Sequence, residues 1–199
     1  PLGRDVFSRM VFGARVSLGI ALAVITSNTI VGSSMGIMSG YFGGKIDALI
    51  MRLVDLIISI PLLLVAIVSA ITFGASLLSL FLLIAAFGWT RYARLIRSES
   101  LALRSQDFVT LAKVAGVSNL RIMFRHILPN VTPTMTVLTT LETGGVILIE
   151  ASLSFLGVGV PPGTPSWGSM VADGRDQLMV NWWVAVFPGL AITMTVLSM

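Results

Sequence analysis

The chain has 199 residues, of which 55% are hydrophobic and only 11% are charged, and its net charge is +4. Soluble domains carry about 25% charged residues, so a lipid bilayer is the expected solvent of this chain. The positive charge is concentrated in one loop, which favours a role in membrane orientation over nucleic-acid binding. The absence of cysteine excludes disulfides, thiolate metal sites and thiol catalysis.

About five apolar segments are predicted to cross the membrane as helices, which makes the chain an all-α membrane protein. The first covers residues 16–39 and is long enough to span a bilayer at about 1.5 Å per residue. Gly32, Gly36 and Gly40 recur in it, or just beyond it, at a spacing of four. Small residues at this spacing favour close approach of a second helix, although a glycine-tolerant membrane helix would show the same pattern.

The second apolar segment, residues 46–73, is expected to be broken at Pro61. Asp55 is one of the few acidic residues at membrane depth, where carboxylates usually face a cavity or a partner. Two interpretations stay open for it, namely an ion pair with Arg52 three residues earlier and direct contact with a cationic substrate. Asp55 and Pro61 are therefore candidate residues of a translocation pathway.

The third segment, residues 77–90, is expected to continue as a helix into Arg91, Arg94 and Arg97. The spacing of three places these arginines on one side, where they could bind lipid phosphate or an acidic surface of a partner. Each could equally be only a marker of the cytoplasmic side. The long basic interval 91–130 between two spans is predicted to be cytoplasmic.

Within this interval a short amphipathic helix is predicted, which Asp107 can cap. Gly116 is expected to end the helix, because a left-handed backbone conformation costs glycine little. Ser118 can cap a second helix, and Pro129 is expected to mark the beginning of the fourth span.

The fourth span, residues 131–157, is expected to be interrupted by Pro133 and by the glycine pair at 144–145. Glu142 and Glu150 are eight residues apart, so they share one broad face of an unbroken helix. Pore lining or hydrogen bonding between helices is favoured over acid–base catalysis, because neither a metal-binding set nor a nucleophile accompanies them.

Residues 157–169 are rich in proline and glycine and predict an ordered loop. A short outer helix carrying Asp173, Arg175 and Asp176 is expected next, followed by a last span anchored by Trp182 and Trp183. With 91–128 inside, this loop and residues 1–15 lie outside. Three arginines of that first stretch then run against the positive-inside trend; they are Arg4, Arg9 and Arg15.

The basic interval resembles the EAA loop of ABC importer permeases, whose pattern is Glu-Ala-Ala, three residues, Gly, nine residues, Ile, one residue, Leu-Pro. Ala112, Gly116, Leu128 and Pro129 fall in register; Thr110, Leu111 and His126 replace the usual Glu, Ala and Ile. Five further segments are similar to the dipeptide/oligopeptide/nickel branch; they are GRDVFSR (3–9), YARL (92–95), RHILPN (125–130), SLSFLGVG (152–159) and PPGTPSWG (161–168).

This resemblance implies a type I ABC importer permease fold in which residues 1–199 form a single transmembrane permease domain. It also implies that a first transmembrane helix precedes this chain and that the end of the last span follows it. Residues 91–130 would form a cytoplasmic EAA-type coupling loop. The residues implied to contact the ATPase are Asp107, Phe108, Thr110, Leu111, Ala112, Gly116 and Arg121.

The implied function is to form half of the translocation pathway for di- or oligopeptides in a bacterial or archaeal plasma membrane. The implied partners are a homologous permease, two cytoplasmic ATP-binding subunits and an external substrate-binding protein. No enzyme activity and no cofactor are expected in this chain, with ATP used by the partner subunits. Gly44-Lys45 looks superficially like a phosphate-binding loop, but Ser39 and Ile46 replace the Gly and the Ser or Thr required.

Three alternatives remain. The same machinery could carry nickel or another small solute. A proton-coupled secondary transporter would predict an internal repeat, and no convincing repeat is found. A membrane enzyme would have to use Asp55, Glu142, Glu150 or His126.

Overall fold

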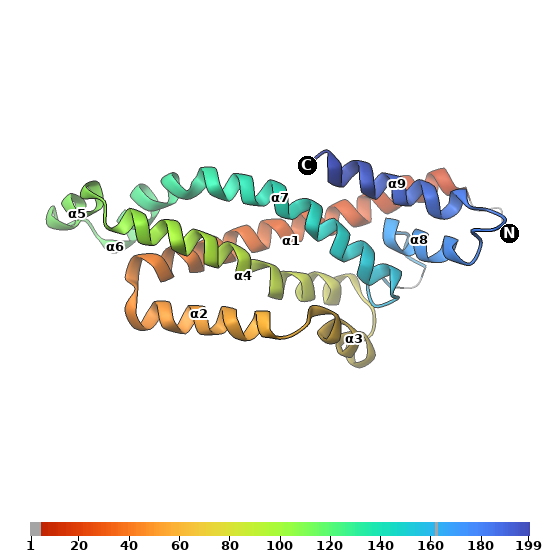
Figure 1. Cartoon of the computed structure of the whole chain (residues 1–199), viewed down its shortest axis with the longest axis horizontal. Coiled ribbons are helices and arrows are strands. Elements are labelled where there is room, and N and C mark those ends of the chain that lie inside the picture. Colours follow the sequence, from red (N-terminus) through yellow and green to blue (C-terminus); the bar gives the residue numbers. More distant parts are fainter. Residues whose placement is uncertain (1–4, 162) are drawn as a thin grey trace. The chain divides into compact units, whose positions relative to one another are not determined.

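The computed structural model describes residues 5–161 and 163–199, which form helices joined by turns and loops, without strands (Figure 1). Residues 3 and 4 of the GRDVFSR segment, which include Arg4, and Pro162 of the proline-rich loop lie outside the described residues. The elements are α1 (Val6–Phe42), α2 (Gly44–Ser59), α3 (Leu62–Phe73), α4 (Leu77–Arg104), α5 (Asp107–Val114), α6 (Asn119–Ile122), the π-helical η1 (Met123–Ile127), α7 (Leu128–Phe155), α8 (Trp167–Arg175) and α9 (Trp183–Leu197).

Three helical runs of the described chain are long and apolar enough to cross a membrane: α1, α4 and the continuous run Asn119–Phe155. Helices α2 and α3 reach this length only as a pair, and they are bent by 77° at the break around Pro61. The predicted break is therefore confirmed. Helix α9 is apolar but has only 15 residues. The expected number of about five spans is accordingly approximate.

The chain divides into two compact units. The first unit contains residues 1–25, 61–86 and 140–199, and the second contains residues 26–60 and 87–139. The expectation that residues 1–199 form a single permease domain stays a prediction.

In the second unit α1 packs closely against α4 along the predicted glycine row. A Cβ atom added at Gly36 would lie 2.8 Å from the carbonyl oxygen of Ala93, and one at Gly40 would lie 2.5 Å from the Cβ of Ser100. Gly32 faces Trp89 in the same way. The interpretation of this spacing as a site of close helix approach is confirmed.

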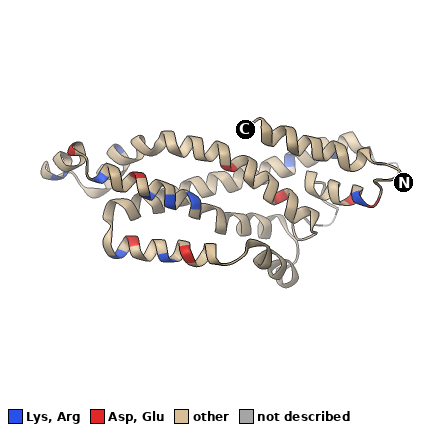
Figure 2. Cartoon of the chain, in the orientation of Figure 1, with Lys and Arg blue, Asp and Glu red and all other residues tan. Residues whose placement is uncertain are grey.

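Two ion pairs join α2 to α4 in the same unit, and Figure 2 shows the acidic and basic positions along both helices. Nε and Nη2 of Arg97 donate to the two carboxylate oxygens of Asp47 at 2.5 and 2.6 Å. The hydroxyl of Ser39 donates to the same carboxylate. Nη2 of Arg94 donates to Oδ1 of Asp55 at 2.5 Å.

These contacts correct one of the two interpretations of Asp55, because its ion pair is with Arg94 of α4 and not with Arg52. The interpretation of the arginine row also changes, since Arg94 and Arg97 both hold carboxylates of α2. From the sequence, Arg52 was the nearest cation to Asp55 on the same helix. The packing of α4 against α2 places Arg94 beside Asp55 instead. The row therefore contributes at least two of its three arginines to packing.

Helix α7 continues through Pro133 and the glycine pair, so the predicted interruption is wrong. Hydroxyl groups next to the proline donate to backbone carbonyls: Thr132 to Leu128 at 2.8 Å and Thr136 to Thr132 at 3.0 Å. Such bonds help a membrane helix to tolerate proline. Gly144 lies against α9, where an added Cβ would be 3.2 Å from Val196.

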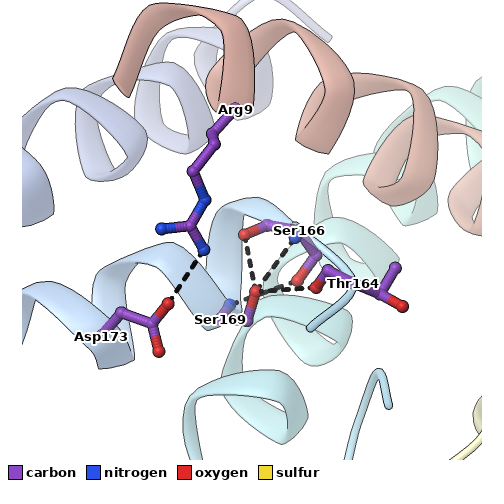
Figure 3. Close-up of polar contacts among 5 residues, drawn as sticks. All are labelled: Arg9, Thr164, Ser166, Ser169 and Asp173. Atoms are coloured by element: carbon purple, nitrogen blue, oxygen red, sulfur yellow. Dashed lines mark hydrogen bonds and ion pairs between the residues drawn. The ribbon is translucent and has the colours of Figure 1, made fainter. Parts of the chain in front are cut away.

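In the first unit, side-chain hydrogen bonds cap the N-terminus of α8 (Figure 3). Ser166 and Ser169 form a reciprocal capping box, so the helix begins at Trp167, inside the segment expected to be irregular. The buried indole of Trp167 donates from Nε1 to the carbonyl of Met10 at 3.2 Å. Arg9 and Asp173 form an ion pair at 3.0 Å. The predicted short helix is confirmed for Asp173 and Arg175, while Asp176 stands at its C-cap position.

Candidate coupling surface

The short helix predicted within the basic interval is α5, which lies next to α6 at one end of α4 (Figure 1). Gln106 occupies the N-cap position without a side-chain hydrogen bond, and Asp107 is the first helical residue. The prediction that Asp107 caps the helix is therefore wrong by one position. A carboxylate in the first turn still interacts favourably with the positive end of the helix dipole.

Gly116 ends α5 as predicted. Its φ angle is +76°, and the two hydrogen bonds of a Schellman motif surround it. The N–H of Val117 donates to the carbonyl of Ala112 at 3.0 Å, and the N–H of Gly116 donates to Lys113 at 3.0 Å. An added Cβ would meet no atom within 4 Å. The requirement for glycine is thus set by backbone conformation alone.

Beyond Gly116 the helix restarts after Ser118, which stands at the N-cap of α6 without a side-chain hydrogen bond. Pro129 is the second residue of α7, and α7 continues the run of α6 and η1 without a break. Proline lacks an N–H and its ring crowds the carbonyl four residues earlier, which the wider π-helical turn of η1 accommodates. Nδ2 of Asn130 donates to the carbonyl of His126 at 2.6 Å.

The inner face of α5 is anchored in a buried apolar cluster of the second unit. This anchoring cluster contains Ile37, Tyr41, Ile96, Val109, Ala112, Ile122, Met123, Ile127 and Val131. It therefore joins α5 to α1, α4, α6, η1 and α7. Such packing makes α5 a rigid extension of these helices rather than a loosely tethered loop.

Polar contacts add to the anchoring cluster. The hydroxyl of Tyr41 donates to Oδ1 of Asn119 at 2.7 Å. The ammonium group of Lys113 lies 5.0 Å above the ring of the same tyrosine. Sequence reasoning missed these residues, because Tyr41 and Asn119 are 78 positions apart and neither belongs to a motif.

The outer face of α5 consists of Asp107, Thr110, Leu111 and Val114, all of which are exposed. The side chains of Leu111 and Val114 are unusually open, at 67% and 83% relative exposure. This face thus presents aliphatic surface beside a carboxylate and a hydroxyl. Exposed aliphatic groups on a short, firmly anchored helix suit burial in a groove of another protein.

The remaining residues implied to contact the ATPase lie around this face. Gly116 and Arg121 are exposed, and Phe108 lies at the edge of α5, with its ring centroid 6.3 Å from that of His126. Ala112 is buried in the anchoring cluster, so it serves the inner face. The structure therefore brings six of the seven residues to the surface of one short segment.

The candidate residues for translocation belong to different units. Asp55 is in the second unit and is paired with Arg94. Pro61, Glu142 and Glu150 belong to the first unit. The side chain of Glu150 is fully buried, and Oε1 accepts a hydrogen bond from Ser154 at 2.8 Å. Among the described residues, no group of three or more His, Cys, Asp or Glu side chains could hold a metal ion.

Residues 32–199 match the family described as the binding-protein-dependent transport system inner membrane component. The chain belongs to this family. It is accordingly a multi-pass membrane protein, and a permease component rather than an enzyme.

Curated relatives cover nearly the whole chain. A putative peptide transport system permease protein of Brucella suis is 42% identical over 98% of this chain and 66% of its own length. The dipeptide transport system permease protein DppC of Alkalihalophilus pseudofirmus is 40% identical over 98% of this chain and 64% of that protein. The oligopeptide transport system permease protein OppC of Haemophilus influenzae is 37% identical over 97% and 62%. The chain thus spans slightly less than two thirds of these relatives.

A solved structure shows the same fold. The chain resembles a chain of the MetNI methionine ABC transporter in an inward-facing conformation, with a TM-score of 0.76 and 15% sequence identity. The match covers 96% of this chain and 90% of that one. The sequence motifs indicated a resemblance to ABC importer permeases, and this structural match confirms it at the level of fold.

Proposed function

We propose that this chain forms half of the translocation pathway of an ATP-driven importer for di- or oligopeptides. The proposal is supported by family membership and by relatives whose names refer to peptide, dipeptide or oligopeptide transport. Nickel or another small solute is the alternative cargo of the same machinery. The substrate class rests on relatives that are longer than this chain.

The proposed complex contains this permease, a homologous permease, two cytoplasmic ATP-binding subunits and an external substrate-binding protein. It lies in a bacterial or archaeal plasma membrane. ATP is bound and hydrolysed by the ATP-binding subunits, and this chain needs no cofactor of its own.

The observation that carries the proposal is the two-sided character of α5. Val109 and Ala112 fasten its inner face to the anchoring cluster, while Leu111 and Val114 are exposed on the outer face. When the ATP-binding subunits close, a helix buried in their groove moves with them. The anchoring cluster then passes that displacement to α1, α4 and α7, whose movement drives alternating access to the pathway.

The contact with the ATP-binding subunit has a particular chemistry in this chain. Thr110 stands where the EAA pattern has Glu, and its hydroxyl bonds back to the carbonyl of Gln106 at 3.3 Å. The docking therefore relies on burial of Leu111 and Val114 more than on an acidic side chain at position 110. Asp107 supplies the carboxylate of this face, with Phe108, Gly116 and Arg121 around it.

The four candidate pathway residues differ in their surroundings. Pro61 sets the 77° bend between α2 and α3, and irregular backbone of this kind is tolerated at membrane depth where it is buried in protein or lines a cavity. Asp55 is held by Arg94, and Glu142 is partly buried on α7. Glu150 is fully buried and bonded to Ser154, so we assign it to helix packing instead of direct contact with cargo.

Transport by the assembled complex tests this function. Proteoliposomes containing both permeases and the ATP-binding subunits, with the binding protein outside, are expected to accumulate labelled dipeptide only when ATP is present inside. A nickel salt serves as the competing cargo. Accumulation driven by a proton gradient without ATP would contradict the proposal, and uptake of nickel but not peptide would replace the cargo.

A further inference from the structure

A partly open cavity of about 350 Å³, with Leu120 and Phe124 exposed at its edge, lies within the second unit between α1 and the segment that follows α5. Ile30, Ser34 and Met38 line it from α1, and Leu120 and Phe124 line it from α6 and η1. Its volume falls in the range of about 300–1,000 Å³ that is usual for small-molecule sites. The proposed function does not use it.

The walls are almost entirely apolar, and one of them is the membrane-length helix α1. Such walls offer few hydrogen-bond partners to water that enters this partly open cavity. Met38, Met123 and Met135 all contribute to the lining. Their flexible, polarizable side chains adapt to an irregular apolar ligand better than branched residues do. A hydrocarbon chain from the bilayer therefore suits this cavity.

One lining residue carries an unused hydrogen-bonding group. Ser33 is 2% exposed, and its hydroxyl oxygen has no hydrogen-bond partner among the described residues. A buried hydroxyl without a partner is unfavourable, and an acceptor from a ligand would remove that cost. The ester carbonyl of a phospholipid is such an acceptor, at the point where the acyl chain meets the head group.

Cationic groups flank the same wall. Arg121 and Arg125 each follow a wall residue directly, are four positions apart and are exposed. Neither forms a hydrogen bond or ion pair with another residue in the described part of the chain. Basic groups beside an apolar pocket between membrane helices attract anionic head groups. The positive charge of these arginines complements a lipid phosphate. A neutral hydrocarbon would leave this charge without a partner.

We propose that this cavity binds an anionic phospholipid of the bilayer. One acyl chain lies between α1 and the α6–η1 segment, an ester carbonyl accepts a hydrogen bond from Ser33, and the phosphate lies against Arg125. The bound lipid contacts the segment that links α5 to α7. It therefore stabilises the structural connection between the coupling helix and the membrane.

Native mass spectrometry of the purified complex tests the site, with phosphatidylglycerol or phosphatidylcholine of identical acyl chains added in turn. The wild-type complex is expected to bind phosphatidylglycerol more tightly. Ser34→Phe fills the cavity and should weaken binding of both lipids at least tenfold. Arg125→Gln should lower the affinity for phosphatidylglycerol about fivefold and leave phosphatidylcholine unchanged, as expected for one cation near an anionic surface. Arg52→Gln, which removes an exposed charge from α2, is the matched control and should change neither affinity.

Each result decides the question. Equal affinities of the wild-type complex for the two lipids would overturn the anionic part of the proposal. Lipid binding unaffected by Ser34→Phe, in complexes that assemble normally by gel filtration, would overturn the cavity as its location. If the Ser34→Phe complex does not assemble, the affinities of Arg125→Gln and Arg52→Gln for phosphatidylglycerol are compared instead. Equal affinities of these two variants would contradict the proposed site. Short-range cross-linking of a Ser34→Cys variant to the sister permease in high yield would also contradict it, because protein would then fill the cavity.

Discussion

Two glycines of the second unit are needed for different physical reasons. Gly116 has a left-handed backbone and open space around its Cβ position, whereas Gly36 is an ordinary helical residue pressed against α4. Substitution at the first position strains the chain, and substitution at the second creates a collision. Substitutions can distinguish backbone strain at Gly116 from steric overlap at Gly36, because different new side chains are sensitive to each.

At Gly116, valine should impair coupling much more than asparagine does. The left-handed conformation costs a β-branched residue about 1–2 kcal/mol or more, while asparagine adopts it readily. Gly116→Val should therefore tilt or extend α5 without disturbing the spans. The measurement is co-purification of the ATP-binding subunit together with transport. Normal association and transport in Gly116→Val would remove the coupling role from this turn.

At Gly36, a single methyl group should already destabilise the protein. The new Cβ would lie 2.8 Å from the carbonyl of Ala93 and 2.9 Å from the Cβ of Ile96, and such overpacking costs about 1–3 kcal/mol. Gly19→Ala in the same helix is the control, because no atom lies within 4 Å of its Cβ position. Thermal unfolding in detergent should show a lower midpoint for Gly36→Ala only. Equal midpoints would contradict the close packing of α1 on α4.

The sequence predicted those features of single residues that depend on local backbone or on spacing. Gly116 as a helix end and the glycine row of α1 are examples, since each is visible within one segment. The partner of Asp55 was not predictable in this way, because Arg94 is 39 positions away and becomes its neighbour only through helix packing. The same holds for Tyr41 and Asn119.

Among the elements, α2 and α4 are joined by ion pairs of unequal burial. The side chains of Arg97 and Asp47 are 33% and 18% exposed, whereas those of Arg94 and Asp55 are 51% and 64% exposed. Only the first pair has two donors on two carboxylate oxygens. The more buried, bidentate pair should therefore contribute more to the packing of α2 on α4.

Arg97→Gln should consequently destabilise the protein by about 1–3 kcal/mol, because it leaves a partly buried carboxylate without its cation. Arg94→Gln removes the same charge from the same helix and should cost less than about 1 kcal/mol. Both variants are compared by their thermal unfolding midpoints at equal ionic strength. If Arg94→Gln proved the more harmful, the assignment of the structural pair would have to be reversed.

Proline was an unreliable guide to the ends of elements. At Pro61 the helix does break, and α2 and α3 diverge by 77°. At Pro129 and Pro133 it continues, through a π-helical turn and through hydroxyl groups that donate to nearby carbonyls. The sequence shows where a backbone donor is missing. It does not show whether neighbouring groups compensate for the loss, which depends on side-chain conformation.

For the whole molecule, the orientation of the chain in the membrane can be tested directly. A cysteine at Ser105, beside α5, is expected to react only with reagent on the cytoplasmic side, and one at Thr164, before α8, only from outside. The chain has no native cysteine, so the labelling background is low. Labelling of the Thr164 site from the cytoplasm would invert the topology and remove α5 from the side where ATP is available.

The central claim is that the outer face of α5 binds the ATP-binding subunit, and one paired substitution tests it most directly. Leu111→Asp places a charge on this face, and Ser118→Asp places the same charge seven residues later at an N-cap position that tolerates it. Loss of one buried leucine corresponds to at least a tenfold weaker association. Affinity of the purified permease pair for the ATP-binding subunit should therefore fall at least tenfold in Leu111→Asp and less than twofold in Ser118→Asp. Unchanged affinity in Leu111→Asp would contradict the coupling role of α5.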